Sequence, residues 1–261
     1  MDKLRIKNRL EIEKMKRSGK AAATVLKRIG EAIAPGVSTA DLERISRDTI
    51  AEVNATSSFL GYQLPEHRPY PATICTSLND VVIHGIPDES QVLKKGDIIG
   101  IDTAVSIDGY HGDNAYTFAV GDISFVAERL LNATRNSLYD AIAEAKPGNR
   151  IGDISSKLQN GAESQGFSVL QNFAGHGIGR NLHEAPEVPC VGVAGRGLRL
   201  KPGMVLAIET MVNVGLPDVQ MLPDGWTITT VDGSLSALFE HTVVILSDGP
   251  EILTGSELWE I

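Results

Sequence analysis

Apolar residues recur at intervals of three and four in two long stretches of the chain, each followed by a Pro-Gly pair. The first stretch ends at Pro35-Gly36, and the second runs from Ser124 to Pro147-Gly148. This spacing is typical of an amphipathic helix, and Pro-Gly is a common end signal. Two long helices are therefore predicted, with apolar faces formed by Ile12, Met15, Ala22, Val25, Leu26, Ile29 and Ile33 in the first and by Leu130, Leu131, Leu138 and Ile142 in the second.

A shorter helix is predicted after each long one. Ser38 is a good N-cap, and Asp41 follows three residues later in the pattern of a capping box. The corresponding helix in the second part of the chain is expected around Asp153. Both parts of the chain thus begin with a helix, a Pro-Gly pair and a second helix.

Two strand-like segments are near copies of each other and end on an acid. Residues 93–102 read LKKGDIIGID, and residues 200–209 read LKPGMVLAIE. Each has a Gly turn, a short apolar run rich in β-branched residues, and a carboxylate where a core residue is expected. A second strand-like run follows each copy, with Asp113 in GDNAYTFAV and Glu240 in FEHTVVIL. We predict an α+β fold and prefer a single domain, residues 1–261, with related halves at about 1–120 and 121–261, although two domains fit the length equally well.

Composition and charge narrow the range of partners. The 261 residues are 42% hydrophobic and 22% charged, with a net charge of −9 and a pI near 5.2. An acidic chain disfavours nucleic acid or an anionic membrane as the main ligand, and we interpret the basic first twenty residues as the solvated side of a helix. No apolar run approaches the ~20 residues that span a bilayer, and no signal-peptide pattern is present, so a cytoplasmic protein is expected. Cys75 and Cys190 lack the spacing of a disulfide framework or thiolate zinc site.

The four acids are expected to meet on one face of a sheet. Asp108-Gly109 is a strong hairpin turn, which places Asp113 opposite Asp102 or one diagonal step away. The duplication predicts the same relation for Glu209 and Glu240. Like charges about 4 Å apart repel by about 4 kcal/mol at an effective dielectric near 20, so the cluster requires bound cations, and two divalent ions would balance it. The alternative is that these acids are strand ends paired with Lys or Arg.

A nitrogen ligand is expected beside the carboxylates. His176 lies in AGHGIGRNLHEAP, where glycines allow close approach of backbone and ring, and it is our choice. His84 shares the tripeptide His-Gly-Ile with it. The remaining histidines outside these motifs, His67, His111 and His241, are interpreted as hydrogen-bonded structural residues.

Several other chemistries lack their motifs. GHGIG is only part of a dinucleotide-binding fingerprint, and no helix signal follows it. HExxH, GxSxG and GxxxxGK[ST] are absent, which removes the zincin, α/β-hydrolase and P-loop interpretations.

From about Ile6 onward the chain resembles type I methionine aminopeptidase, a dinuclear metallopeptidase of the pita-bread fold. The resemblance rests on NDVVIHGIP, GIDTAVSIDGYHGD, GHGIG, LHEAP, LKPGM, IETMVN, DGWT and SLSALFEHT, in the family's order. It implies two pseudo-symmetric halves with a central antiparallel sheet flanked by helices. It also implies two divalent ions (Mn, Fe(II), Co or Zn), ligated by Asp102, Asp113, His176, Glu209 and Glu240.

The resemblance further implies an activity and the residues that perform it. The activity is removal of the initiator methionine from nascent proteins and peptides with a small second residue, by attack of metal-activated water. His84 would handle protons, His183 would donate to the oxyanion, and Glu209 would shuttle a proton. The substrate-binding set would be Phe59, Tyr62, Tyr70, Cys75, His84, Leu182, His183 and Trp226. A monomer is expected, with nascent polypeptides as partners and the ribosome as a candidate partner.

The sequence departs from the usual family pattern at Phe59, Leu182, Thr210 and Leu238 and in an extra segment at Gln63–Pro69. These differences bear on pocket size and selectivity. Two rival interpretations are a proline-specific aminopeptidase or prolidase, which carries a related metal set, and an inactive pita-bread scaffold that binds protein or nucleic acid.

Overall fold

The computed structural model describes residues 4–65 and 67–255, and it contains the helix pairs that the sequence predicts. The first half has α1 (Arg9–Ala32) and α2 (Thr39–Glu52), and the second has α3 (Phe125–Ala143) and α4 (Ile151–Glu163). Ser38 and Asp41 form the predicted capping box of α2, and Ser124 caps α3. The placement of Ile33 in the first helix is wrong. It is the C-cap of α1 in an extended conformation, because the chain must leave the helix before the proline that follows.

The strands form one large antiparallel sheet and one small sheet. The ten-stranded sheet has the order β1-β4-β5-β12-β9-β7-β8, with β2 on β4, β6 on β9 and β13 on β12, and the small sheet has the order β10-β11-β3. The strands are β1 (Thr56–Ser57), β2 (Cys75–Leu78), β3 (Val81–Ile83), β4 (Ile98–Ile107), β5 (Tyr110–Ala119), β6 (Ser168–Val169), β7 (Ala174–Gly177), β8 (Glu184–Pro189), β9 (Val205–Asn213), β10 (Val219–Met221), β11 (Ile228–Thr230), β12 (Ser236–Leu246) and β13 (Gly249–Ile252).

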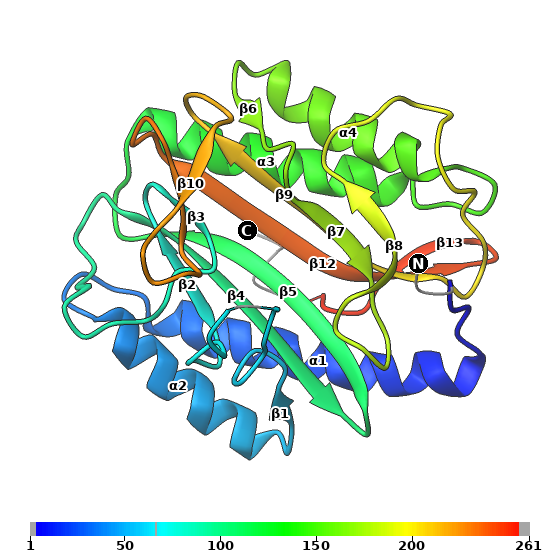
Figure 1. The fold of residues 1–261 in the computed structure, drawn as a ribbon, viewed down its shortest axis with the longest axis horizontal. Helices are drawn as coiled ribbons and strands as arrows, with labels where there is room; N and C mark the ends of the chain where they lie inside the picture. The colour runs from blue at the N-terminus through cyan, green and yellow to red at the C-terminus, as the bar shows by residue number, and fades with distance from the viewer. Residues whose placement is uncertain (1–3, 66, 256–261) are drawn as a thin grey trace.

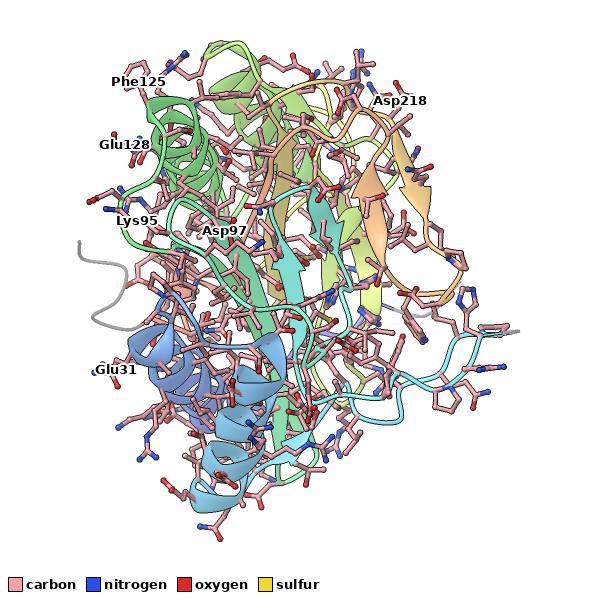
Figure 2. The ribbon with its side chains drawn as sticks, turned by 90° about the vertical axis from the view of Figure 1, so that its left-hand side faces the viewer. Glu31, Lys95, Asp97, Phe125, Glu128 and Asp218 are labelled. Carbon is pink, nitrogen blue, oxygen red and sulfur yellow. The ribbon has the colours of Figure 1, made fainter. Side chains whose placement is uncertain are left out.

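The helices cover one face of the large sheet, and the small sheet lies on the other side (Figure 1). Figure 2 views the sheet edge-on, with Glu31 of α1 and with Phe125 and Glu128 of α3 on the helical side and Asp218 beside β10 on the opposite side. α1 packs on β4 and β5, and α3 packs on β9 and β12. These are the antiparallel sheet and flanking helices of the pita-bread fold. Within the described residues, no helix is both long and apolar enough to cross a lipid bilayer.

The strands that hold the acids are longer than the apolar runs that predicted them. β4 continues five residues past Asp102 to Ile107, and β9 continues past Glu209 to Asn213. The predicted hairpin turn is present, because Asp108 and Gly109 both have positive φ, at 51° and 72°. That conformation matches the twist of the strands that it joins. The acids therefore lie inside strands rather than at their ends.

α1 crosses β5 at very short range beside one of these acids. A Cβ atom on Gly112 would lie 2.6 Å from the backbone nitrogen of Gly19, and Ser18 donates its hydroxyl to the carbonyl oxygen of Tyr110 at 2.7 Å. The crossing fixes β5 from behind, next to Asp113.

Replacing Gly112 with Ala should force α1 away from β5 and lower the free energy of unfolding by about 1–3 kcal/mol. Gly255→Ala is the matched control, since the nearest atom to a Cβ there is 3.8 Å away. Urea unfolding curves of both variants measure the effect. Equal stability of the two variants would contradict the close crossing.

Candidate metal centre

Five neighbouring strands of the large sheet each contribute one side chain to the same region. In the sheet order β4-β5-β12-β9-β7 these side chains are Asp102, Asp113, Glu240, Glu209 and His176. The first two strands come from the first half of the chain and the other three from the second half. The region is therefore assembled at the junction of the two halves.

The strand register places the four acids on one face. Glu240 pairs directly with Glu209 and, on its other side, with Ala115. Asp102 also pairs with Ala115, and Asp113 lies two residues from Ala115 on the same strand. Because side chains alternate along a strand, all four carboxylates point to the same side. Of the two relations predicted for Asp102 and Asp113, the structure has the diagonal one.

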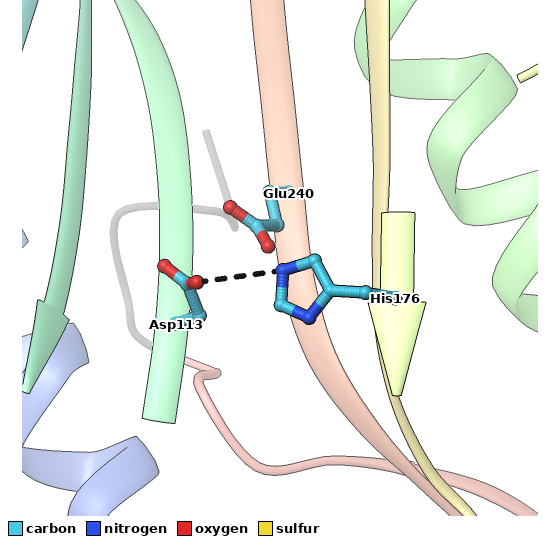
Figure 3. Close-up of side chains that lie close together, drawn as sticks. All are labelled: Asp113, His176 and Glu240. Carbon is cyan, nitrogen blue, oxygen red and sulfur yellow. Dashed lines mark ion pairs between the residues drawn. The ribbon is translucent and has the colours of Figure 1, made fainter. Parts of the chain in front are cut away.

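Ligand atoms of Asp113, His176 and Glu240 lie within 4.8 Å of one another. Figure 3 shows their side chains converging from β5, β7 and β12, with Nε2 of His176 3.8 Å from Oδ2 of Asp113. Asp113 and Glu240 are each only 3% exposed. Asp102 and Glu209 flank this trio on the adjoining strands and are partly exposed. Such a trio, with two further carboxylates beside it, has the oxygen and nitrogen donors of a transition-metal site.

The backbone around His176 selects the tautomer that leaves Nε2 available. Nδ1 donates to the carbonyl oxygen of Gly177 at 2.9 Å, so the lone pair is on Nε2, which faces the acids. Burial, with a smaller contribution from His183, lowers the pKa of His176 to about 3, and the ring is neutral. Gly175 is needed for this close packing, because a Cβ there would lie 2.4 Å from the carbonyl oxygen of Ala207.

The carboxylates lack the partners that would neutralise them. Within the described residues, Oδ1 of Asp102, Oδ1 of Asp113 and Oε1 of Glu240 are buried without a hydrogen-bond partner, and no Lys or Arg pairs with any of the acids. Burial raises the pKa of Asp102 to about 7 and, together with the charge of Asp102, that of Glu209 to about 8. Burial and the neighbouring carboxylates also raise the pKa values of Asp113 and Glu240. Unpaired buried oxygens of this kind fit bound divalent cations, whereas the alternative of strand ends paired with Lys or Arg does not fit.

A buried apolar cluster adjoins the acids through a strand pair. Cys75 of β2 pairs directly with Asp102 of β4. Cys75, Tyr70, Ala72 and Trp226 form a buried cluster, with Phe59, Tyr62 and Ile86 packed against it. Leu182 lies in a neighbouring apolar cluster, and Phe59 and Tyr62 pack against that cluster as well. The structure thus brings the predicted apolar substrate-binding residues together, and Ile86 is a member that the sequence reasoning missed.

The two other predicted site histidines, His84 and His183, contact aromatic residues of this apolar cluster or packed against it. His84 meets the ring of Trp226 edge-on at 6.1 Å between centroids, and its positive φ of 58° is unusual for a residue with a Cβ. Burial lowers the pKa of His84 to about 4. His183 is hydrogen-bonded through Nδ1 to the Tyr62 hydroxyl at 2.7 Å, and its ring centroid is 4.3 Å from that of His176. His183 therefore connects the apolar cluster to His176, whereas His84 contacts the cluster at Trp226.

The extra segment Gln63–Pro69 closes over Trp226. Its ends are joined by a hydrogen bond from the Tyr70 N–H to the Tyr62 carbonyl oxygen at 2.8 Å. The indole N–H of Trp226 donates to the carbonyl oxygen of Arg68 at 2.9 Å. Residue 66 lies outside the described residues. The extra segment therefore fixes the side chain of Trp226, a member of the apolar cluster.

The other departures from the family pattern lie in the apolar clusters or near the acids. Phe59 and Leu182 belong to the apolar clusters. Thr210 is buried and follows Glu209 in β9, and Leu238 is buried two residues before Glu240 in β12. None of the four replaces a carboxylate or the imidazole.

The histidines interpreted as structural have hydrogen-bond partners away from the acids. His67 bonds through Nδ1 to the Gly225 carbonyl oxygen at 2.8 Å, and His111 bonds to the Ser58 hydroxyl at 2.7 Å. His241 bonds to the Thr254 hydroxyl at 2.9 Å. Cys75 and Cys190 are both buried free thiols.

Comparison with known proteins gives the family. The sequence profile of metallopeptidase family M24 matches residues 13–247. The chain belongs to metallopeptidase family M24. Among the M24 relatives, a methionine aminopeptidase of Clostridium acetobutylicum is 49% identical over 97% of this chain and 99% of its own length. Methionine aminopeptidase of Escherichia coli K12 is 46% identical over 95% of this chain and 93% of its own length.

Solved structures agree with this M24 assignment. A methionine aminopeptidase from Thermotoga maritima superposes with a TM-score of 0.94 at 42% identity and covers 97% of this chain and 100% of its own. A Xaa-Pro dipeptidase from Bacillus anthracis shares the fold, with a TM-score of 0.76 at 22% identity, and this chain spans 62% of it. The M24 chain is a metal-dependent hydrolase with a pita-bread fold.

Two contacts that support the site of this M24 chain were not predicted from the sequence. The Thr242 hydroxyl donates to the carbonyl oxygen of Asp113 at 2.8 Å and accepts the Asp113 N–H at 3.0 Å, which fixes the backbone at this acid. Lys7, which we had placed on a solvated helix face, is instead buried before α1 and pairs with Glu184 at 2.9 Å. The solvated interpretation is wrong for Lys7, because only the residues within the helix follow its periodicity. Glu184, the acid that follows His183 in LHEAP, was the feature of the sequence that could have indicated a buried ion pair.

The raised carboxyl pKa values predict an unusual pH dependence for the metal-free protein. Asp102 and Glu209 keep their protons in the folded state up to pKa values of about 7 and about 8, whereas the unfolded groups lose them near 3.8 and 4.5. Below pH 6.5 the lowered pKa values of His84, His176, His183 and His241 act in the opposite sense, because the unfolded imidazoles then bind protons that the folded ones do not. Above pH 6.5 the carboxyl groups alone make the folded state bind more protons, so stability falls as pH rises from about 6.5 to 8. We expect the melting temperature of the chelator-treated protein to fall over this range. Adding Mn²⁺ at the upper pH should restore it, and a metal-independent melting temperature would contradict a cation site.

Proposed function

We propose that this protein removes the N-terminal methionine from nascent proteins and from peptides whose second residue is small. The observation that carries the proposal is the combination of two features on one strand pair. Asp102, at the edge of the carboxylate cluster, pairs with Cys75, which belongs to an apolar aromatic cluster that we propose as the substrate pocket. A substrate whose side chain fills the pocket would present its peptide bond to the carboxylates. The 49% identical methionine aminopeptidase supports the choice of substrate.

Asp102, Asp113, His176, Glu209 and Glu240 would hold two divalent ions in this proposal. The four negative charges of the acids equal the positive charge of two such ions, and the neutral imidazole adds a nitrogen donor. Mn, Fe(II), Co and Zn all suit this donor set. When bound, such ions polarise the substrate carbonyl and lower the pKa of the attacking water. The unpartnered oxygens of Asp102, Asp113 and Glu240 support this assignment.

Glu209 is suited to move a proton between the attacking water and the leaving amine. Burial and the charge of Asp102 raise its pKa while no ion is bound, and a bound divalent ion would lower it. A carboxylate beside the reacting groups can accept a proton from the water and pass it to the amine. Its partial exposure at the edge of the buried trio leaves it accessible to the substrate.

His183 is suited to stabilise the oxyanion. With the Tyr62 hydroxyl donating to Nδ1 at 2.7 Å, the ring carries its proton on Nε2 and can donate it to a developing negative charge. His84 lies across the pocket beside Trp226, neutral at working pH, and is assigned proton handling at the substrate amine. The two histidines thus have different tasks on either side of the reacting bond.

The pocket accounts for a preference for methionine. Tyr70, Trp226 and Phe59 present ring edges and faces, with Tyr70 and Trp226 in edge contact at 5.2 Å between centroids. A flexible thioether makes favourable contacts with aromatic rings and adapts to irregular apolar space. Leu182 and Cys75 belong to the apolar clusters that contain or contact these rings. A hydrogen bond between the Tyr62 hydroxyl and His183 connects these apolar residues to that imidazole.

The proposal includes the setting in which the enzyme works. We assign one catalytic domain spanning residues 1–261, because the carboxylates come from both halves of one sheet. We also propose a monomer that acts on nascent chains in the cytoplasm, with the ribosome as its docking partner. Ribosome co-sedimentation and light scattering test these two assignments.

Asp113→Ala and His176→Ala should each lower kcat/KM for a Met-Ala-Ser peptide by more than about 100-fold, the upper end of the loss seen for outer-shell metal partners. The control is Asp122→Ala, which removes an exposed acid paired with Lys95. Turnover and bound metal are measured on the same samples. Near wild-type turnover in either ligand variant would refute the ligand assignment.

Metal removal should abolish hydrolysis, and return of a single defined ion should restore it. The panel of substrates is Met-Ala-Ser, a peptide with a bulky second residue, and an X-Pro peptide. Methionine cleavage should exceed X-Pro cleavage by at least about tenfold, because the pocket is built for a long apolar side chain. Faster X-Pro cleavage would favour the prolidase interpretation, and absence of metal binding would favour the inactive scaffold.

A further inference from the structure

The loop between β7 and β8 is closed on itself by the residue that follows His183. Oε1 of Glu184 accepts the backbone N–H groups of Arg180 and Asn181 at 2.9 and 3.1 Å. The loop between these contacts carries Leu182 and His183. The carboxylate of Glu184 therefore fixes the conformation of the loop segment that carries His183.

The second oxygen of this carboxylate is bound by a lysine from the start of the chain. Lys7 Nζ lies 2.9 Å from Oε2 of Glu184, and the two side chains are only 5% and 4% exposed. The backbone N–H of Lys7 donates to the carbonyl oxygen of Gly203 at 2.7 Å, just before β9. The segment ahead of α1 thus links the loop that carries His183 to the strand that carries Glu209.

The backbone beneath this ion pair has no room for a side chain. A Cβ atom on Gly179 would lie 2.7 Å from Cε of Lys7 and 2.9 Å from Oε1 of Glu184. The third glycine of GHGIG therefore allows the pair to pack directly on the loop. Because this contact is so close, a displacement of the Lys7 side chain would also displace the loop.

We propose that Lys7 is a positioning residue for His183, acting through Glu184 and the loop at 179–183. The ring of His183 is held on its other side by the Tyr62 hydroxyl, so the two anchors together set its place beside His176. The proposal rests on the proposed function, in which His183 faces the substrate carbonyl. An error of about 1 Å in the position of such a group can lower the rate by about 100-fold.

A purely stabilising role makes a different prediction. Breaking one partner of a buried ion pair destabilises strongly, but replacing both by neutral residues of similar volume is often neutral for stability. The double variant Lys7→Met/Glu184→Gln removes both charges and keeps an acceptor for the two N–H groups. It therefore separates loss of the anchor from loss of folding.

The experiment measures kcat and KM on Met-Ala-Ser for the metal-loaded wild type, Lys7→Met, the double variant and Lys16→Met. Lys16 is the matched control, because it forms an ion pair with Glu251 at 2.8 Å on the exposed side of α1. In the folded double variant we expect kcat to fall at least about tenfold while KM changes less than about threefold, since an interaction made in the transition state is lost. Lys16→Met should match the wild type. A folded double variant with wild-type kcat would overturn the proposal.

Hydrogen exchange supplies a readout that does not depend on turnover. Hydrogen bonds to a carboxylate are stronger than those to a neutral amide, so the amides of Arg180 and Asn181 should exchange faster in the double variant than in the wild type. Exchange should stay unchanged in Lys16→Met. Unaltered exchange at 180 and 181 in the double variant would also overturn the anchor. Faster exchange in a protein whose wild type does not cleave Met-Ala-Ser would sink the proposed function and leave the anchor standing.

Discussion

Four carboxylates on one face of a buried sheet are the constraint on which this structure depends. Glu209 and Glu240 are direct neighbours across two strands, and Asp102 and Asp113 are diagonal neighbours on the next pair. Burial raises all four pKa values, and neighbouring carboxylates raise those of Asp113, Glu209 and Glu240 further, so the folded state tolerates the acids only with protons or with cations. The surrounding fold supplies no Lys or Arg to them within the described residues, which leaves metal ions as the natural counter-charge.

The ten-stranded sheet makes such a cluster possible by joining two similar halves edge to edge. β5 of the first half pairs with β12 of the second, and the acids lie on both sides of this seam. Helices behind the sheet hold the strands in place without entering the site, as the crossing of Gly19 and Gly112 illustrates. The seam therefore acts as a rigid support for the side chains, which is what a site with several ligands requires.

The apolar cluster beside the acids is built largely from segments outside the main sheet. Trp226 follows the small-sheet strand β10, and its indole N–H is bound by the inserted segment at Arg68. His183 lies on a loop that is fixed at one side by Tyr62 and at the other by Glu184 and Lys7. The apolar cluster thus meets the acids in the sheet at Cys75, while its other members Tyr70, Ala72 and Trp226 lie outside the strands.

Local pattern alone was enough for the helices, the hairpin turn and the choice of acids. Helix periodicity, the Ser38–Asp41 capping box and the Asp108-Gly109 turn depend on neighbours in the sequence, and the repeated acid at Asp102 and Glu209 stood out because charge is costly in a buried strand. The pairing of β5 with β12, the contact of Cys75 with Asp102, and the burial of Lys7 against Glu184 join residues far apart in the chain. Only packing decides those contacts, because no periodicity links the partners, and a single charged residue looks the same in sequence whether it meets water or a buried carboxylate.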